Sequence, residues 1–211
     1  MNELRRTFLD TAVLARDLVA SPEVERRWDE PSALPKFSIR GLAGHLIRAT
    51  TSVTAYMDRG EPDGPPISTA AYYADAVSVP DLDSELHRAI RQRGEAEAAG
   101  GRDQLIARFD EALERLQREL EAQPGSRLMR VYDDMVLTLD DYLVSRIIEL
   151  VVHLDDLAVS VGRPLPSIPP IAFEIAIRAL VDVARLKQGD LAVVRALTRR
   201  ERDAVEALRV L

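Results

Sequence analysis

Apolar residues recur every three or four positions along nearly the whole sequence, as on the buried face of an α-helix. The first stretch of this kind contains Leu4, Phe8, Ala12, Leu14 and Leu18. We find no convincing run of alternating β-branched residues of the kind that predicts a β-strand. The pattern therefore predicts an all-α protein.

Capping residues and helix breakers divide this pattern into separate helices. Ser38 is the predicted N-cap of a helix that ends near Gly60. Thr138 and Asp141 form a predicted capping box at the start of a long helix that runs to Val161. The remaining predicted helices are residues 69–76, a polar stretch capped by Asp83 and broken at Gly100-Gly101, an amphipathic stretch from Leu105 to Pro124, residues 170–187, a stretch beginning at Gly189-Asp190, and a short one capped by Thr198 and Glu201.

The length of 211 residues favours a single domain, and the sequence shows no internal repeat and no long disordered tract. We predict a four-helix core within residues 1–163, followed by a helical extension over residues 164–211 that packs on this bundle. The two parts together are expected to form one structural domain.

The net charge of -7 is spread over interleaved acidic and basic residues, and there is no basic stripe. Binding to nucleic acid through phosphate contacts is therefore not expected. No stretch approaches the roughly 18 apolar residues that a membrane span needs. Near the N-terminus, the charged residues Arg5, Arg6 and Asp10 interrupt the apolar positions. We expect a cytoplasmic enzyme or binding protein without a membrane partner.

The sequence contains no cysteine, which excludes disulfides, iron–sulfur clusters, cysteine-ligated zinc and a cysteine nucleophile. Any metal must be bound by His, Asp or Glu, and there are only 3 histidines. His87 lies among Glu85, Arg88 and Arg91, so we interpret it as solvated. His45 falls on the apolar stripe of its predicted helix, where it is either a core histidine or a ligand.

The predicted helix of residues 138–161 carries one narrow polar stripe on an otherwise aliphatic surface. At about 100° per residue, the stripe contains Tyr142, Arg146, Glu149, His153, Asp156 and Ser160. A helix that is apolar over most of its circumference lies inside a protein. The stripe therefore faces either a thin window of solvent or an interior polar site.

Two interpretations of Glu149 and His153 follow from this pattern. In the first they are a surface pair four residues apart, which contributes a few tenths of a kcal/mol, roughly. In the second their Cβ atoms lie about 5–6 Å apart on one helix face, and both side chains bind one ion at roughly 2.0–2.2 Å. His45 then supplies a third ligand from another helix. Two nitrogens and one oxygen leave a coordination position open, as in catalytic zinc sites.

Three stretches of the sequence resemble a known family. The first is Trp28-Asp29-Glu30-Pro31-Ser32-Ala33-Leu34-Pro35 followed by residues 38–48, which include Gly44-His45-Leu46. The second is Asp141-Tyr142-Leu143 followed by residues 146–157, and the third and weaker one covers residues 189–197. In these stretches the chain resembles the DinB-like superfamily and, more closely, the mycothiol-dependent maleylpyruvate isomerase N-terminal domain family of actinobacteria.

The resemblance implies a DinB-like four-helix bundle with additional C-terminal helices. It also implies a divalent metal ion, which we take to be Zn²⁺, bound at the family's ligand positions by His45, Glu149 and His153. The implied cosubstrate is a low-molecular-weight thiol, which is mycothiol in actinobacteria. The isomerase itself has a further C-terminal α/β domain with no counterpart in this sequence, so neither the maleylpyruvate reaction nor further catalytic groups are carried over.

Because the chain has no cysteine thiol of its own, a reacting thiol must come from the cosubstrate. A thiol at the open metal position loses its proton, whereas a free thiol with a pKa of about 8.5 is mostly protonated at pH 7. The predicted function is therefore a metal- and thiol-dependent S-transferase or isomerase in which the thiolate attacks a small electrophile.

Two charged residues on the polar stripe have a predicted role beside the metal, each with an alternative. Arg146 either binds an anionic group of the substrate or cosubstrate, or pairs with Glu149 or another nearby carboxylate. Asp156 either accepts the second N–H of His153, or is a solvated residue on the helix surface.

Two aromatic residues are candidates for the wall of the pocket. Tyr142 lies on the polar stripe, one turn before Arg146, and Trp28 belongs to the first of the matching stretches. For Trp28, packing in the core is the alternative.

Two further functions stay open from the sequence. One is a non-catalytic protein that binds a metal or small ligand on the same bundle, although the presence of both His45 and Glu149 favours catalysis. The other is a metal-dependent hydrolase that uses a metal-bound water, and thiol dependence of the activity separates it from the first function. The expected partners are a small electrophile and a thiol, and the chain is expected to be a monomer or a homodimer.

Overall fold

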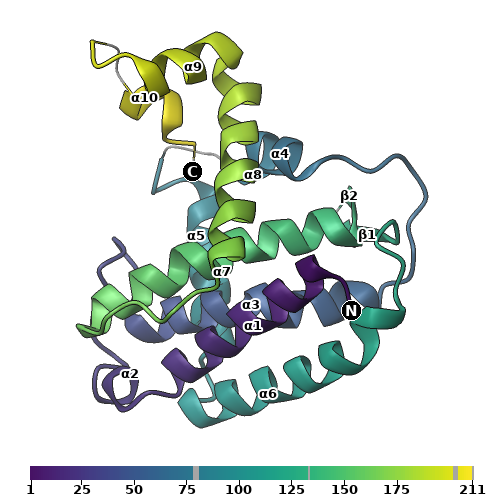
Figure 1. Cartoon of the computed structure of the whole chain (residues 1–211). Helices are drawn as coiled ribbons and strands as arrows, with labels where there is room; N and C mark the ends of the chain where they lie inside the picture. The colour runs from purple at the N-terminus through teal and green to yellow at the C-terminus, as the bar shows by residue number, and fades with distance from the viewer. Residues whose placement is uncertain (78–80, 133, 202–203, 211) are drawn as a thin grey trace.

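Four long helices form the core of the computed structural model, which describes residues 1–77, 81–132, 134–201 and 204–210. They are α1 (Glu3–Val19), α3 (Ile39–Met57), α6 (Arg102–Glu119) and α7 (Leu139–Val161) (Figure 1). Helices α1 and α3 each pack against both α6 and α7. This arrangement is a four-helix bundle, as the sequence predicts.

Shorter elements surround the bundle. They are α2 (Pro22–Arg26), α4 (Thr69–Tyr72), the π-helical turn η1 (Tyr73–Val77), α5 (Glu85–Glu97), the 3₁₀ turn η2 (Leu120–Ala122), α8 (Pro170–Gln188), α9 (Asp190–Thr198) and α10 (Ala204–Leu208). Helix α5 packs along α3, and α8 packs against α7 and α4. The predicted helix of residues 69–76 is thus present, with its second half wound as a π-helix.

The caps predicted for the two central helices are confirmed. Ser38 Oγ accepts a hydrogen bond from the backbone N–H of Gly41 at 2.9 Å. Thr138 Oγ1 accepts one from the N–H of Asp141 at 3.0 Å and donates one to Asp141 Oδ2 at 2.6 Å. Helix α7 ends at Gly162, which adopts a left-handed conformation with φ of 71° that favours glycine.

Two other predicted caps are wrong, the one at Asp83 by one residue and the one at Thr198 because this residue lies within α9. Ser84, and not Asp83, caps α5 by accepting a hydrogen bond from the N–H of His87 at 3.2 Å. Thr198 is the last residue of α9, where its hydroxyl donates back to the carbonyl of Val194 at 2.7 Å. Serine, threonine and aspartate make similar local hydrogen bonds, so neighbouring candidates are hard to separate by sequence.

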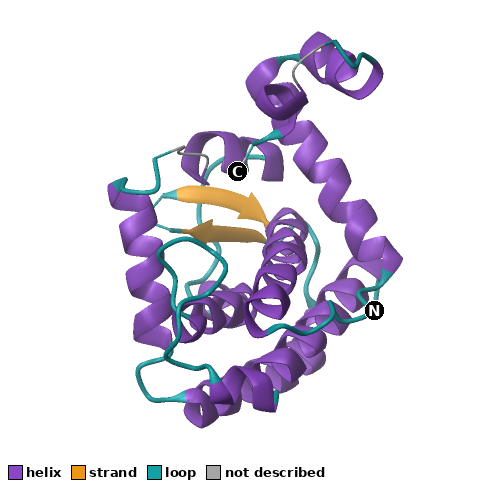
Figure 2. Cartoon of the chain, turned by 90° about the vertical axis from the view of Figure 1, so that its left-hand side faces the viewer, coloured by secondary structure: helices purple, strands orange, loops and turns teal. Residues whose placement is uncertain are grey.

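A short β-hairpin departs from the all-helical prediction. Strands β1 (Leu128–Val131) and β2 (Met135–Thr138) pair antiparallel, with Leu128 opposite Thr138 and Val131 opposite Met135 (Figure 2, orange). The N–H of Ile67 extends the pairing by donating to the carbonyl of Val136 at 2.8 Å. Strands of four residues are too short for alternation to be recognised against a helical pattern.

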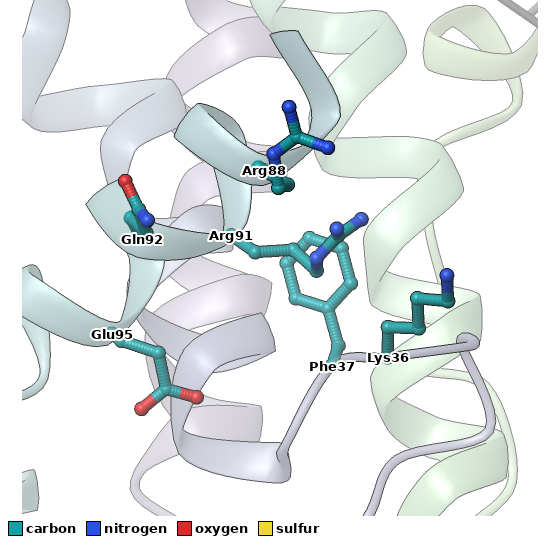
Figure 3. Close-up of a pocket in the computed structure, with 6 residues that line it drawn as sticks. All are labelled: Lys36, Phe37, Arg88, Arg91, Gln92 and Glu95. Atoms are coloured by element: carbon teal, nitrogen blue, oxygen red, sulfur yellow. The ribbon is translucent and has the colours of Figure 1, made fainter. Parts of the chain in front are cut away.

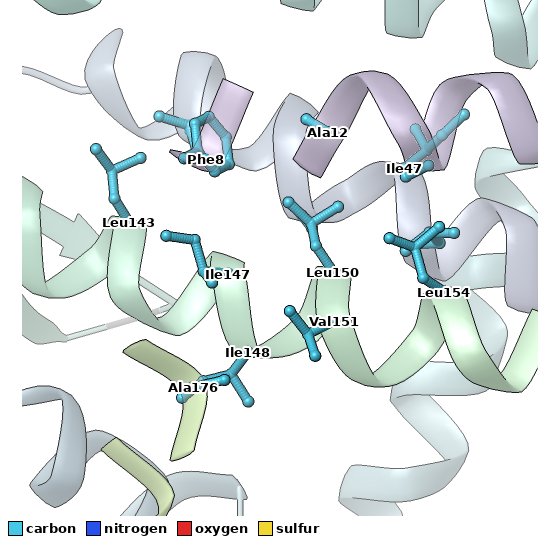
Figure 4. Packing of buried hydrophobic residues seen from close by; sticks show 14 of the residues in the cluster. Phe8, Ala12, Ile47, Leu143, Ile147, Ile148, Leu150, Val151, Leu154 and Ala176 are labelled. Atoms are coloured by element: carbon cyan, nitrogen blue, oxygen red, sulfur yellow. The ribbon is translucent and has the colours of Figure 1, made fainter. Parts of the chain in front are cut away.

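Helix α7 lies at the centre of the hydrophobic core. Figure 4 shows its side chains, Leu143, Ile147, Leu150 and Leu154 among them, packed between Phe8 of α1 on one side and Ala176 of α8 on the other. Every one of these residues is almost fully buried. The burial of α7 over most of its circumference is what the aliphatic composition of residues 138–161 predicts.

The C-terminal helices lie partly outside the bundle. Helix α8 crosses α7 and extends beyond it, and α9 and α10 are at its far end (Figures 1 and 2). The fold is therefore an all-α, DinB-like bundle with additional C-terminal helices, to which the hairpin is added. The division at residue 163 stays a prediction. No helix in the described part of the chain is both long and apolar enough to cross a membrane.

Candidate metal centre

Three side chains from two helices converge at one point. Helix α3 carries His45, and α7 carries Glu149 and His153 one turn apart. His45 Nε2 lies 3.2 Å from Glu149 Oε2 and 3.2 Å from His153 Nε2. The distance between Glu149 Oε2 and His153 Nε2 is 3.4 Å. The fold thus brings together three residues that are up to 108 positions apart in the sequence.

The spacing of these three atoms fits a single metal ion. Ligands about 2.0–2.1 Å from a tetrahedral ion are roughly 3.3 Å from one another, since the edge of a tetrahedron is about 1.6 times its centre-to-corner distance. The separations of 3.2, 3.2 and 3.4 Å match one face of such a tetrahedron. Two imidazole nitrogens and one carboxylate oxygen are also a donor set that zinc accepts. The three side chains therefore fit a zinc ion.

The three side chains are mostly buried, which argues against the interpretation of Glu149 and His153 as a solvated surface pair. The exposed fractions are 18% for His45, 15% for Glu149 and 16% for His153. A solvated pair on a helix surface would be far more exposed than this. The polar stripe of α7 faces an interior site at this point.

A very close contact between α3 and α5 sets the position of His45. A Cβ atom added to Gly44 would lie 2.1 Å from the carbonyl oxygen of Gly94. One added to Gly94 would lie 2.3 Å from the carbonyl oxygen of Gly41 and 3.4 Å from the Cβ of His45. Only glycine permits the two backbones to come this close. The backbone of α5 therefore lies directly beside the ligand on α3.

His153 is oriented from within its own helix. Its Nδ1 atom lies 2.8 Å from Oδ2 of Asp156, three residues further along α7. A carboxylate only accepts hydrogen bonds, so the Nδ1 atom carries the hydrogen and Nε2 is the atom available to an ion. The role predicted for Asp156 stays a prediction, but its side chain lies where that role requires.

Tyr73 contacts Glu149 from outside the bundle. The hydroxyl group of Tyr73, in η1, lies 2.9 Å from Glu149 Oε1 and 3.0 Å from the carbonyl oxygen of Ser145. Its hydrogen bond engages Oε1, whereas Oε2 faces the two histidines. No sequence pattern pointed to Tyr73, because the contact depends on how the segment before α5 folds back on α7.

The electrostatic environment differs between the three candidate ligands. Burial lowers the pKa of His45. Burial also acts on Glu149 by disfavouring its charge, but hydrogen bonds with His153 and His45 outweigh it and hold the pKa of Glu149 well below its usual range. For His153, hydrogen bonds with Asp156 and Glu149 outweigh the effect of burial and raise the pKa to about 9. Without a metal, the site therefore holds a neutral His45, a carboxylate and a protonated His153 at pH 7.

A cavity of about 390 Å³ opens beside the three side chains, all of which line it. Tyr56, Tyr72, Tyr132 and Tyr142 form an aromatic wall, in which the rings of Tyr72 and Tyr132 stack with their centroids 6.2 Å apart. The hairpin contributes to the site in this way, since Tyr132 directly follows β1. Burial raises the pKa of Tyr142 to about 12, so its hydroxyl group is neutral.

Arg146 lines the same cavity and is only 8% exposed. Its guanidinium lies over the ring of Tyr142, 4.7 Å from the centroid, and its Nε atom donates to Ser145 Oγ at 3.1 Å. The described residues offer it no carboxylate within ion-pair distance. The pairing of Arg146 with Glu149 that the sequence left open is therefore not observed.

For two residues, the structure differs from an interpretation drawn from the sequence. Trp28 packs against the hydrophobic core and is not among the described residues that line the cavity. His87, interpreted as solvated, is half-buried and lines the cavity. The close contact between α5 and α3 turns part of a polar helix toward the site, which is why its charged neighbours gave the wrong exposure.

A second, shallower hollow of about 290 Å³ lies between the loop before α3 and α5. It is lined by Lys36, Phe37, Arg88, Arg91, Gln92 and Glu95 (Figure 3). Phe37 and Arg91 line the cavity beside the candidate ligands as well, so the two hollows adjoin. The Lys36 ammonium group is paired with Asp83, and Arg91 donates to the carbonyl of Leu82 at 2.9 Å. The cations of this outer hollow therefore already have partners.

Comparison with known proteins identifies a family. The model of the mycothiol maleylpyruvate isomerase N-terminal domain matches residues 10–158, which is more than half of the chain and includes all three candidate ligands. No curated protein and no solved structure matches the chain.

Proposed function

Because the chain belongs to the mycothiol maleylpyruvate isomerase N-terminal domain family, we propose that His45, Glu149 and His153 bind one divalent metal ion at which an external thiol is activated. The protein is then a metal-dependent S-transferase or isomerase that uses a low-molecular-weight thiol. We propose Zn²⁺ as the ion and mycothiol as the thiol, in a cytoplasmic protein that is a monomer or a homodimer.

The observation that carries this proposal is the triangle of ligand atoms. Its sides of 3.2, 3.2 and 3.4 Å suit three corners of a tetrahedral site. The fourth corner has no protein ligand among the described residues. A cavity of about 390 Å³ adjoins the same side chains and gives room for two small molecules to meet there.

A bound divalent ion would supply Lewis acidity, which ionises a thiol near neutral pH. The residues of this chain supply the rest. Asp156 fixes the ring of His153, and Tyr73 fixes the carboxylate of Glu149, so the donor atoms are held before any ligand arrives. Four tyrosines, Tyr56, Tyr72, Tyr132 and Tyr142, line the cavity and make much of its wall aromatic. The chain has no cysteine that could compete with the external thiol.

The proposed reaction forms a carbon–sulfur bond. The thiol releases its proton to solvent, and the sulfur lone pair attacks an electrophilic carbon. In a transfer, the leaving group departs with the electron pair of the bond that breaks. In an isomerisation, the adduct rotates about the bond that has become single, and the carbon–sulfur bond then breaks again with return of the electron pair to sulfur.

Metal content tests the first half of the proposal. Untagged protein should contain close to one divalent ion per chain by mass spectrometry of the dissolved metals, and His153→Ala should lose that ion. His87→Ala is the matched control, because His87 lines the same cavity outside the triangle. Retention of the full metal content in His153→Ala would contradict the site.

Thiol binding tests the second half. Protein reconstituted with Co²⁺ should show a new sulfur-to-metal charge-transfer band on addition of thiol, and conjugation of the thiol to a halogenated aromatic should require the metal. A fully loaded protein that gives no band and no turnover with any of several thiols would favour a hydrolase or a non-catalytic binding protein.

A further inference from the structure

Four arginines line the cavity beside the candidate metal centre, and they differ in how their charge is compensated. Arg48 pairs with Glu97 at 2.9 Å. Arg91 donates to a backbone carbonyl at 2.9 Å. Arg93 is half-buried and lies over the ring of Tyr132, 5.5 Å from its centroid. Arg146 is the most buried of the four, at 8% exposed, and no carboxylate among the described residues forms an ion pair with it.

Most N–H donors of the Arg146 guanidinium have no hydrogen-bond acceptor among the described residues. A guanidinium carries five N–H groups and stays charged at any pH a protein encounters. Only the Nε–H group of Arg146 is used, in the hydrogen bond to Ser145 Oγ. The two N–H groups on Nη1 and the two on Nη2 have no partner among the described residues. Tyr142 covers one face of the group, 4.7 Å from its ring centroid.

A cation in this state is costly to the folded protein. Removing a charge from water costs several kcal/mol, roughly, and the nearby Glu149 carboxylate offsets only part of that cost because it forms no ion pair with Arg146. Arg146 lies on the same helix as Glu149, one turn away, and lines the cavity beside it. An anionic ligand in the cavity would therefore compensate this charge.

The charges of the filled site indicate which kind of ligand this is. A divalent ion is offset by the Glu149 carboxylate and one thiolate, whereas Asp156 is already engaged by His153. The positive charge of Arg146 is left over. It is a single charge on a planar fork, which matches a carboxylate in both charge and geometry.

We propose that Nη1 and Nη2 of Arg146 form a carboxylate-binding site inside the cavity, which binds an acid group on one of the two substrates. The identity of these substrates rests on the proposed function, but the anion site does not. The acid group belongs either to the electrophile or to the thiol, and the same fork serves both.

Binding of benzoate to the metal-free full chain tests the site directly. Benzoate is a planar carboxylate, and benzamide is its neutral counterpart of the same shape. Titration calorimetry should show benzoate binding about tenfold or more tightly than benzamide, because only the anion compensates Arg146. Benzoate should also raise the melting temperature. Equal binding of the two compounds would overturn the proposal.

Two variants test whether benzoate binding depends on Arg146. Arg146→Met should weaken benzoate binding by about tenfold or more, while its melting temperature stays the same or rises, because a buried unpaired charge has been removed. Arg93→Met removes another arginine of the same cavity and should leave benzoate binding within about threefold. Wild-type affinity in Arg146→Met, or an equal loss in Arg93→Met, would overturn the assignment. If Arg146→Met does not fold, the comparison of benzoate with benzamide on the wild-type protein still decides.

A third titration separates the two sources of the acid group. It uses metal-loaded protein saturated with 2-mercaptoethanol, a thiol without a carboxylate. Benzoate that still binds beside the thiol assigns the carboxylate to the electrophile, and benzoate that is displaced by the thiol assigns it to the cosubstrate. Both outcomes support the site.

The results also distinguish this inference from the proposed function. Benzoate binding that depends on Arg146 in a protein that takes up no metal would contradict the metal centre and leave the carboxylate site. Full metal loading without benzoate binding would contradict the carboxylate site and leave the metal centre.

Discussion

The two helices that form the candidate metal centre hold their ligands by different means. On α7, the contacts are between side chains, since Asp156 lies against His153 and Tyr73 lies against Glu149. On α3, the backbone holds His45, through the contact that Gly44 makes with Gly94 of α5. The electrostatic result differs as well, with a lowered pKa for His45 and a raised one for His153.

This difference shows two ways to position a histidine. Hydrogen bonds fix the orientation of a ring and its proton, and they can be lost one at a time. A backbone contact fixes the position of the whole helix. It is lost entirely when an added side chain occupies the space between the two backbones. Substitutions at the α3 contact should therefore mainly lower the free energy of unfolding. Substitutions beside the α7 side chains should mainly lower the metal affinity.

The largest effect is expected from Gly44→Ala. Its Cβ would lie 2.1 Å from the carbonyl oxygen of Gly94, a backbone atom that cannot move aside without shifting α5. We expect a loss of about 3 kcal/mol in the free energy of unfolding, measured by urea denaturation. Gly41→Ala is the control, because its new Cβ meets the flexible Glu95 side chain at 2.6 Å. Equal losses in the two variants would show that the backbone contact is not what holds α3.

The next effect concerns Asp156→Asn, which keeps the shape of the side chain and removes its charge. Loss of a carboxylate that orients a metal-binding histidine lowers metal affinity by about 10–100-fold. Competition with a chromophoric chelator measures it. Asp155→Asn removes an equal charge from the exposed neighbour and should change affinity little. An unchanged affinity in Asp156→Asn would remove Asp156 from the site.

The dependence of metal binding on pH should separate the two histidines. His153, with a pKa of about 9, is protonated at pH 7 and must lose that proton to bind an ion, whereas His45, with a lowered pKa, is already neutral. Metal affinity should therefore rise by up to about tenfold per pH unit from pH 7 and level off near pH 9. Calorimetry in buffers of different ionisation enthalpy should count close to one released proton per ion. Release of no proton would contradict the raised pKa of His153.

The smallest effect is expected from Tyr73→Phe. It removes one hydrogen bond to Glu149, with an expected loss of about fivefold in metal affinity, which corresponds to about 1 kcal/mol. Tyr72→Phe is the control, since Tyr72 is equally buried and its hydroxyl makes no hydrogen bond within the described part of the chain. A larger effect in Tyr72→Phe than in Tyr73→Phe would remove Tyr73 from the set of positioning residues.

The parts of the fold that could be predicted are those with a local cause. The long helices follow from apolar spacing, and the starts of α3 and α7 follow from Ser38 and Thr138. Glu149 and His153 could be paired because they lie four residues apart on one helix. The hairpin could not be predicted, since its strands are four residues long and the intervening Tyr132-Asp133-Asp134 lacks the glycine of a common hairpin turn.

The parts of the site that could not be predicted depend on packing between distant segments. The contact of Tyr73 with Glu149 spans 76 residues, and no periodicity relates the two positions. The charged residues near His87 predict a surface position, whereas α5 packs so close to α3 that this histidine lines the cavity. The glycines at positions 41, 44 and 94 were the available signal, but glycines that permit contact and glycines in ordinary turns look alike in a single sequence.

The contact between α3 and α5 also limits how the site could be transplanted by design. Three ligand positions on two helices would be a small motif to copy into another bundle. Without α5, however, nothing would fix the depth at which His45 enters the triangle, and a site built to about 0.5 Å tolerance requires such support. The smallest portable unit is therefore the three helices α3, α5 and α7, with Gly44 and Gly94 included as strictly as the candidate ligands.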